Sequence, residues 1–258
     1  KAGRINDRQA TIELLNFFKK NLRLQGLPLP KGVEWAGNLN LGLSPVEIEQ
    51  FQDMWQQVGG KRRWLVDQGI ALAYYAEKKH HLASAALLDL GQSQARIVLI
   101  EDKKPVYQQV LPWGIERLFL ALEGFFAQQN IIVNAAGLEQ IVEGLLSLNP
   151  EIKKQLVLPV RMGLNQEPNN LRINSKQLLT VTTQAMQLLA TLISDFLVLL
   201  PATLQELVQR QGLILVGGGA NLDFLDHFLT QQLKILVKTG DEPLYANLLG
   251  LEEWFNSR

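Results

Sequence analysis

The chain has no cysteine, and its charges cancel: 25 Lys and Arg stand against 25 Asp and Glu in 258 residues. The lack of cysteine excludes a disulfide framework, a thiolate zinc site and a cysteine nucleophile. The lack of a basic excess argues against a protein dedicated to nucleic acid, because such proteins carry a positive footprint. What is present is enough chain for one large or two small domains, with 47% hydrophobic residues to build a core.

The sequence also lacks a clean apolar run of the roughly 20 residues that a membrane-spanning helix needs. Its most apolar stretch, Leu188–Leu204, is interrupted by Ser194, Asp195 and Pro201. We therefore interpret the long apolar helix over 178–200 as a core helix. No charged and then apolar signal segment opens the chain, so the expected compartment is the cytoplasm.

Helical and strand-like periodicities alternate along the chain, which indicates an α/β fold. Ser44, Pro45 and Glu47 form a capping pattern that marks the start of one helix. The segment 130–174 has a less regular pattern, with a turn predicted at Gln166–Asn170. We expect helices over 7–23, 44–58, 69–79, 115–128, 138–148, 175–199, 222–232 and from 243, and strands over 63–66, 85–89, 96–101, 105–111, 213–216 and 235–238.

A glycine-rich turn gives the strongest local signal for a binding site. Gly217, Gly218 and Gly219 lie between a buried strand and an amphipathic helix. Such a turn lets the backbone approach a ligand closely and directs amide groups at an anion. A tight strand-to-helix turn without a ligand has equal weight, since glycine motifs need context. No Gly-Lys-Ser/Thr follows, so a Walker motif is excluded.

A second signal lies at the end of the strand over 85–89. Asp89 is followed by Gly91 in a predicted hairpin turn, an arrangement that can hold a carboxylate beside a metal-phosphate group. Taken alone, this pattern is better explained as a hairpin with a polar turn. The order of the two patterns along the chain, first the hairpin after Asp89 and later the glycine turn, is a more specific indication of a site than either pattern alone.

The meander 89–111, Gly114 before a helix and the turn at 217–219 together resemble the actin-like ATPase superfamily, and the chain is most similar to its MreB-like cell-shape actins. The resemblance extends nearly end to end. It implies an α/β, actin-like (ribonuclease H-like) two-domain fold with domain I incomplete. Residues 1–84 would form the partial domain I and 85–258 domain II, with a smaller inserted subdomain near 137–174. The family's first phosphate loop has no counterpart here and would lie upstream of Lys1.

The resemblance also implies a site for ATP and Mg²⁺. Gln68 falls at the family's water-orienting position, where an amide supports at most a slow ATPase. Asp89 would hold magnesium through water. In the second phosphate loop Ser93 replaces a glycine, and Gln94 and Ala95 replace hydroxyl residues, so the ATP site is degenerate. The implied nucleotide-binding residues are Asp89, Gly91, Gln92, Ser93, Gln94, Gly114, Gly217, Gly218, Gly219, Ala220 and Asn221.

The implied function is that of a cytoskeletal or scaffold protein in cell-shape determination, which self-assembles into filaments or joins other cell-shape or assembly proteins. Leu22, Leu24, Leu27 and Leu29 beside basic residues predict a weak peripheral contact with the inner face of the membrane. An alternative of equal weight is that Leu27 and Leu29 cover an edge of the hydrophobic core and do not contact a membrane. The alternatives are a pseudo-actin adaptor like the pilus-assembly protein PilM, and a slow ATPase in the enzymatic sense. No nucleic acid partner is expected.

Overall fold

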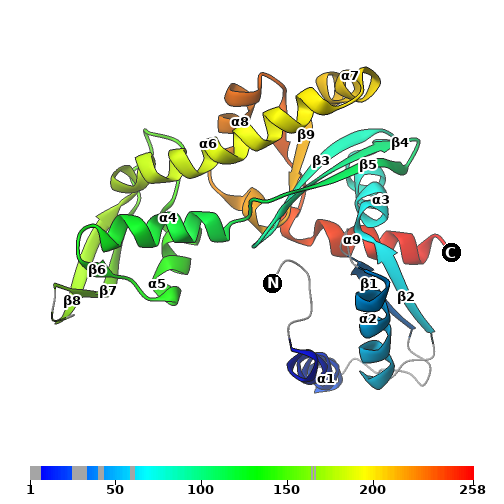
Figure 1. Cartoon of the computed structure of the whole chain (residues 1–258), viewed down its shortest axis with the longest axis horizontal. Coiled ribbons are helices and arrows are strands. Elements are labelled where there is room, and N and C mark those ends of the chain that lie inside the picture. The colour runs from blue at the N-terminus through cyan, green and yellow to red at the C-terminus, as the bar shows by residue number, and fades with distance from the viewer. Residues whose placement is uncertain (1–6, 25–33, 40–43, 59–61, 164, 166) are drawn as a thin grey trace. The chain divides into compact units, whose positions relative to one another are not determined.

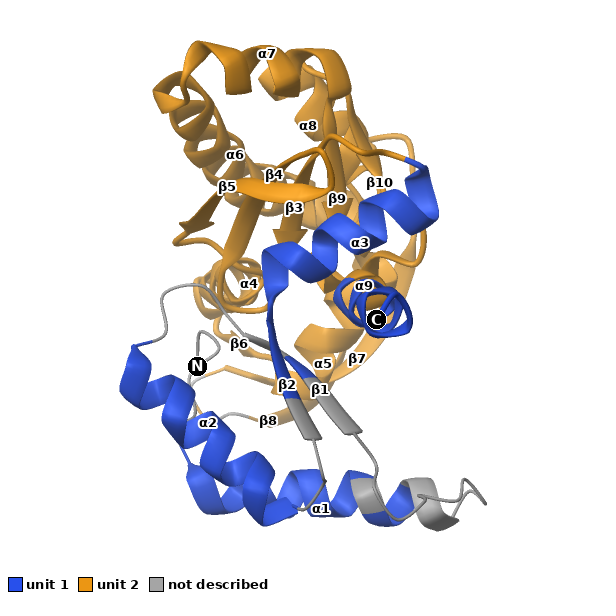
Figure 2. Ribbon diagram, turned by 90° about the vertical axis from the view of Figure 1, so that its right-hand side faces the viewer, with its two compact units in different colours: residues 1–81, 247–258 blue, residues 82–246 orange. Residues whose placement is uncertain are grey.

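The computed structural model describes residues 7–24, 34–39, 44–58, 62–163, 165 and 167–258. They fold into two compact units, which Figure 2 shows in different colours. The first unit contains the described residues of 1–81 together with 247–258, and the second contains those of 82–246. Each unit is described separately below.

The first unit is built on a pair of parallel strands, β1 (Glu34–Leu39) and β2 (Arg62–Asp67). Its helices are α1 (Arg8–Leu24), α2 (Pro45–Val58), α3 (Gln68–His80) and α9 (Ala246–Asn256). The predicted capping pattern forms at the start of α2. The backbone N–H of Ser44 donates to Glu47 Oε2 (2.7 Å), and the N–H of Glu47 donates to Ser44 Oγ (3.3 Å).

The carboxyl-terminal helix α9 belongs to the first unit, whereas the sequence analysis assigned everything after residue 84 to the second domain. Two contacts tie it there. Lys78 Nζ of α3 lies 3.1 Å from Glu253 Oε2 of α9, and the Arg258 guanidinium, which follows α9, lies 4.3 Å from the ring centroid of Trp64 in β2. Sequence order alone could not predict this return of the chain, because the contacts join residues far apart in the sequence.

The second unit contains a five-stranded mixed sheet in the order β10-β9-β3-β4-β5, of which Figure 1 labels β9, β3, β4 and β5. The predicted meander is present as β3 (Ala85–Leu90), β4 (Ala95–Glu101) and β5 (Lys104–Leu111), which pair antiparallel. The strands β9 (Leu213–Val216) and β10 (Val237–Thr239) extend the sheet in parallel with β3. This mixture of parallel and antiparallel pairs agrees with the predicted α/β class.

Helices α4 (Glu116–Ala127), α6 (Ser175–Leu199), α7 (Ala202–Gln211) and α8 (Leu225–Leu233) share a core with one face of this sheet. Leu88 and Ile97 point into that core. Within the described part of the chain, α6 is the one helix with the length and composition to cross a membrane. Its Met186 and Ile193 are fully buried, whereas polar residues such as Gln187 are exposed, so we interpret it as a core helix.

A smaller antiparallel sheet, in the order β6-β7-β8, occupies the segment with the irregular pattern. Its strands are β6 (Ile131–Ile132), β7 (Gln155–Met162) and β8 (Glu167–Asn174), accompanied by α5 (Ala135–Gln140) and a π-helical turn over Ile141–Leu145. The turn predicted at 166–170 is wrong for Glu167–Asn170, which belong to β8. Because β8 is an edge strand, the missing N–H of Pro168 is tolerated there.

Candidate functional site

The site in the second unit begins where β3 and β9 end side by side. Asp89 is paired in parallel register with Val216, so the turn after β9 starts next to the loop after β3. A Cβ on Gly217 would collide with Oδ1 of Asp89 and would lie 2.7 Å from the carbonyl oxygen of Leu90. The two loops predicted to bind a nucleotide are therefore in direct contact.

The loop after β3 is closed by its own backbone and by the start of α4. The N–H of Gly91 donates to the carbonyl of Gln94 (3.1 Å), and the N–H of Glu116 donates to the carbonyl of Gln92 (2.8 Å). Gly114 makes this approach possible, because a Cβ there would lie 2.5 Å from the Gln92 carbonyl oxygen and from the Gln94 nitrogen. The amide of Glu116 is thus already used by the loop and is not available to a phosphate.

The glycine-rich turn after β9 forms one turn of 3₁₀ helix over Gly218–Asn221. Gly217 precedes it with φ 83° and ψ 169°, a conformation that is essentially restricted to glycine. Its N–H donates to the carbonyl of Pro243 (2.7 Å), and its carbonyl accepts from the N–H of Ala220 (3.1 Å). The predicted tight turn between β9 and the following helix is therefore present, and the approach of its backbone to a ligand stays a prediction.

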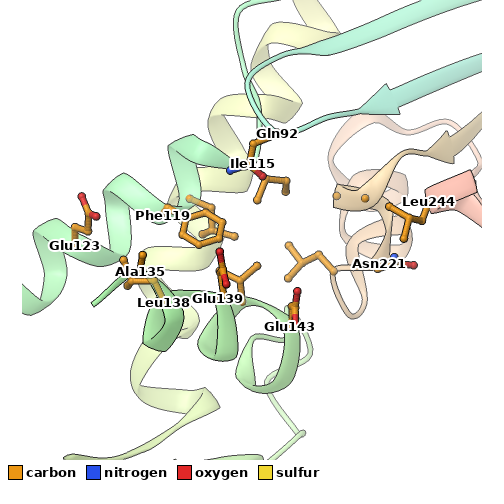
Figure 3. Close-up of a pocket in the computed structure, with 15 residues that line it drawn as sticks. Gln92, Ile115, Phe119, Glu123, Ala135, Leu138, Glu139, Glu143, Asn221 and Leu244 are labelled. Atoms are coloured by element: carbon orange, nitrogen blue, oxygen red, sulfur yellow. The ribbon is translucent and has the colours of Figure 1, made fainter. Parts of the chain in front are cut away.

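A cavity of about 860 Å³ lies beside this turn, with its lining side chains shown in Figure 3. This volume is within the range of small-molecule sites, about 300–1,000 Å³. The turn after β9, α4 and the α5 region surround the cavity, and most of the lining is apolar, with Phe119 and Leu138 on one side and Leu244 on the other. Its size and mostly apolar lining are typical of sites for small molecules.

The polar lining of the cavity is acidic. Glu123 comes from α4, Glu139 from α5 and Glu143 from the π-helical turn, and all three side chains are exposed. None of the described residues that line the cavity is Lys, Arg or His. Exposed carboxylates in water interact with a charge at 4 Å by about 1 kcal/mol each, so they would weaken the binding of a polyphosphate without excluding it.

The resemblance places magnesium at Asp89 through water, and this role stays a prediction. The residue directly opposite Asp89 in the β3–β4 pair is Arg96. In the part of the chain that the structure describes, no group of three or more His, Asp or Glu side chains is arranged to hold a metal ion. We therefore derive no step through a metal here.

The structure brings the predicted nucleotide-binding residues together in the second unit, from the loop 89–94, Gly114 and the turn 217–221. Four of them line the cavity: Gln92, Gly218, Gly219 and Asn221. Gln68 begins α3 in the first unit, after Asp67, whose carboxylate accepts from the N–H of Gly69 (2.8 Å). The catalytic role of Gln68 stays a prediction.

Sequence reasoning missed the acidic residues that line the cavity. Among them is Glu139 of α5, which was not among the predicted site residues. A signal was present, since Glu139 and Glu143 are four residues apart and so share one helical face. The spacing of two residues along the sequence does not reveal which cavity their shared face lines.

The mixed sheet and the paired glycine loops define an actin-like ATPase fold. The family model described as MreB/Mbl protein matches residues 1–257, and the chain belongs to this family. It is 20% identical to the cell shape-determining protein Mbl of Bacillus subtilis (strain 168), over 97% of this chain and 75% of that protein. The family match favours an MreB-like bacterial actin homologue over the pilus-adaptor alternative.

Solved structures agree in fold. MreB5 of Spiroplasma citri bound to ADP matches with a TM-score of 0.88 at 16% identity, over 100% of this chain and 78% of that one. The MamK double helical filament matches with a TM-score of 0.79 at 15% identity, over 99% and 79%. These likenesses confirm the predicted actin-like α/β fold.

Proposed function

We propose that this protein is a cytoskeletal or scaffold protein in cell-shape determination. The observation that carries the proposal is the family match over residues 1–257. Its support is the similarity to Mbl, a cell shape-determining protein, over nearly the whole chain. A scaffold role does not require repeated hydrolysis of ATP, so it is compatible with a site whose residues depart from the family's phosphate-loop pattern.

Self-assembly is the proposed mechanism. Head-to-tail contacts between copies generate filaments when the rotation between them does not close a ring. The likeness to a subunit of the MamK double helical filament supports such contacts in this fold. Partners would then be further copies of this chain, together with other cell-shape or assembly proteins.

The proposed ligand of the second unit is an adenine nucleotide, by analogy with the ADP that MreB5 binds. Gly218, Gly219 and Asn221 of the turn after β9 would line it on one side, and Gln92 on another. Hydrolysis would be slow at most, because Gln68 can orient a water molecule but is a poor base. Nucleotide would then act by stabilising one arrangement of the protein.

We propose the cytoplasm as the compartment, with a peripheral contact at the inner face of the membrane. Two of the four leucines proposed to contact the membrane, Leu22 and Leu24, lie in the last turn of helix α1. Leu27 and Leu29 lie outside the described residues, so the proposal rests on the sequence: leucines beside Lys19, Lys20 and Arg23 suit weak binding to an anionic surface.

Sedimentation and negative-stain electron microscopy, with and without ATP, test the assembly proposal. We expect pelletable filaments above a critical concentration. A protein that stays monomeric at high concentration in both conditions would exclude a filament-forming scaffold. Floating the protein with anionic and with neutral vesicles tests the membrane contact separately, and equal recovery from both would argue against it.

A further inference from the structure

Asp223 follows the glycine-rich turn and makes three contacts with a distant segment of the second unit. Its backbone carbonyl accepts from the N–H of Leu148 (3.0 Å), and its carboxylate accepts from Lys154 Nζ (3.0 Å). It also pairs with Ser147 in a short parallel bridge. All four residues belong to the second unit, so these contacts lie within one compact body.

The contacts of Asp223 join two walls of the cavity. Asn221 and Leu222, which precede it directly, line the cavity from the turn after β9. Glu143 lines it from the π-helical turn over Ile141–Leu145, and the segment that contacts Asp223 lies just after that turn. Figure 3 shows Glu143 and Asn221 on different sides of the cavity. The contacts of Asp223 therefore hold one wall against the other.

Lys154 reaches Asp223 from a backbone that is itself fixed. The N–H of Lys154 donates to Ser175 Oγ (3.1 Å), and the N–H of Ser175 donates to the Lys154 carbonyl (3.0 Å). Ser175 is the buried first residue of α6, and its hydroxyl donates to the carbonyl of Ile152 (2.7 Å). Because the backbone of Lys154 is already ordered, the ion pair with Asp223 costs less conformational entropy.

The residue after Asp223 has an unfavourable backbone conformation. Phe224 has φ 68° and ψ 14°, in the left-handed region that bulky residues rarely adopt. Such strain persists only where the surrounding contacts enforce it, and it gathers at ligand sites and switch regions. Here the contacts of Asp223 act on one side, and the bond from the N–H of Phe228 to the Phe224 carbonyl (3.0 Å) acts on the other. Loss of the Asp223 contacts should therefore let the turn relax.

We propose that Lys154 and Asp223 form a clamp that sets the separation of the two cavity walls, so that Lys154 positions the ligand without touching it. Neither residue is among the described residues that line the cavity. The proposal rests on the proposed function in taking an adenine nucleotide as the ligand. A ligand that binds best to the clamped walls binds more weakly once the clamp is broken.

Isothermal titration calorimetry with ADP tests the clamp in the wild type, Lys154→Met and Asp223→Asn. The two side chains are 37% and 38% exposed, so neither variant leaves a buried charge and both should fold. We expect each variant to bind ADP about five-fold more weakly. The double variant should bind no more weakly than either single variant, because the two residues act as one unit. Lys154→Arg keeps the ion pair and should keep the wild-type affinity.

The direction of the effect of Asp223→Asn separates the clamp from simple electrostatics. ADP is an anion, so without a clamp the loss of a nearby carboxylate would strengthen binding, and only the loss of the ammonium group would weaken it. The clamp predicts that both changes weaken binding. An Asp223→Asn protein that binds ADP as tightly as the wild type, or more tightly, would overturn the proposal.

Gln205→Ala is the control for lost stability. Its side chain donates to the carbonyls of Val198 (3.2 Å) and Leu200 (2.8 Å), at the junction of α6 and α7, and does not line the cavity. We expect this variant to have a lower Tm and the wild-type affinity for ADP. A loss of affinity equal to that of the clamp variants would assign the effect to stability and would count against the clamp.

A measurement without ligand decides the clamp independently of nucleotide binding. Because the chain has no cysteine, Gln140→Cys in α5 and Gln232→Cys in α8 place two spin labels at exposed positions. Double electron–electron resonance should give a narrow distance distribution that broadens when Asp223→Asn is added. If ADP does not bind the wild type and the distribution still broadens, nucleotide binding fails and the clamp stands. An unchanged distribution would overturn the clamp.

Discussion

Replacing Gly217 by alanine should destabilise the second unit because two costs add. The residue has φ 83° and ψ 169°, a region that costs a residue with a Cβ about 1–3 kcal/mol. The added Cβ would also lie 2.7 Å from the carbonyl oxygen and 2.9 Å from the nitrogen of Leu90, and backbone atoms cannot rotate away. Overpacking of this kind costs about 1–3 kcal/mol more.

The two costs together predict a loss of about 2–6 kcal/mol in the free energy of unfolding. For a unit of this size, 1 kcal/mol shifts Tm by about 2–4 °C, so the midpoint should fall by on the order of 10 °C. Differential scanning calorimetry measures this shift directly. Because the same Cβ collides with Oδ1 of Asp89, the substitution should also disturb the contact between the two loops.

Gly218→Ala is the matched control. Its Cβ would meet only the Cδ1 atom of Leu244, at 3.4 Å, and the residue is exposed. We expect a change within about 0.5 kcal/mol. If Gly217→Ala and Gly218→Ala unfold at the same temperature, the reasoning from backbone conformation and close packing is refuted.

Three further predictions concern other parts of the chain. Asn174→Ala removes the capping box of α6, in which Asn174 Oδ1 accepts from the third residue of the helix (3.1 Å), and should cost about 1 kcal/mol in urea unfolding. Neutralising Glu139 and Glu143 with glutamine should raise the affinity for ADP several-fold in calorimetry, with the gain shrinking as salt is added; an unchanged affinity would show that these carboxylates do not face the ligand. Arg258→Ala should cost about 0.5–1 kcal/mol and change tryptophan fluorescence, because its guanidinium covers the Trp254 ring.

Much of the sheet in the second unit was predictable from local signals. The three-stranded meander follows from the short turns around Gly91 and Asp102, which fix antiparallel pairing between neighbours in the sequence. The pairing of Asp89 with Arg96 was also within reach, since a hairpin closed by residues 91–94 puts 90 opposite 95 and 89 opposite 96. The magnesium role of Asp89 came from the family resemblance and not from the hairpin, and it stays a prediction.

Other features depend on contacts that no local pattern reveals. Pro168, Asn169 and Asn170 are turn-forming residues, yet they lie in β8 because the strand is paired on one side only. The cavity is formed by α4, the α5 region and the turn after β9, which are far apart in the sequence. Helix α9 returns to the first unit for the same reason.

The central proposal is that this member of the MreB/Mbl family is a filament-forming scaffold. Electron microscopy of the purified chain over a range of concentrations, with and without ATP, tests it most directly. We expect filaments above a critical concentration. A protein that stays monomeric at high concentration in both conditions would contradict it.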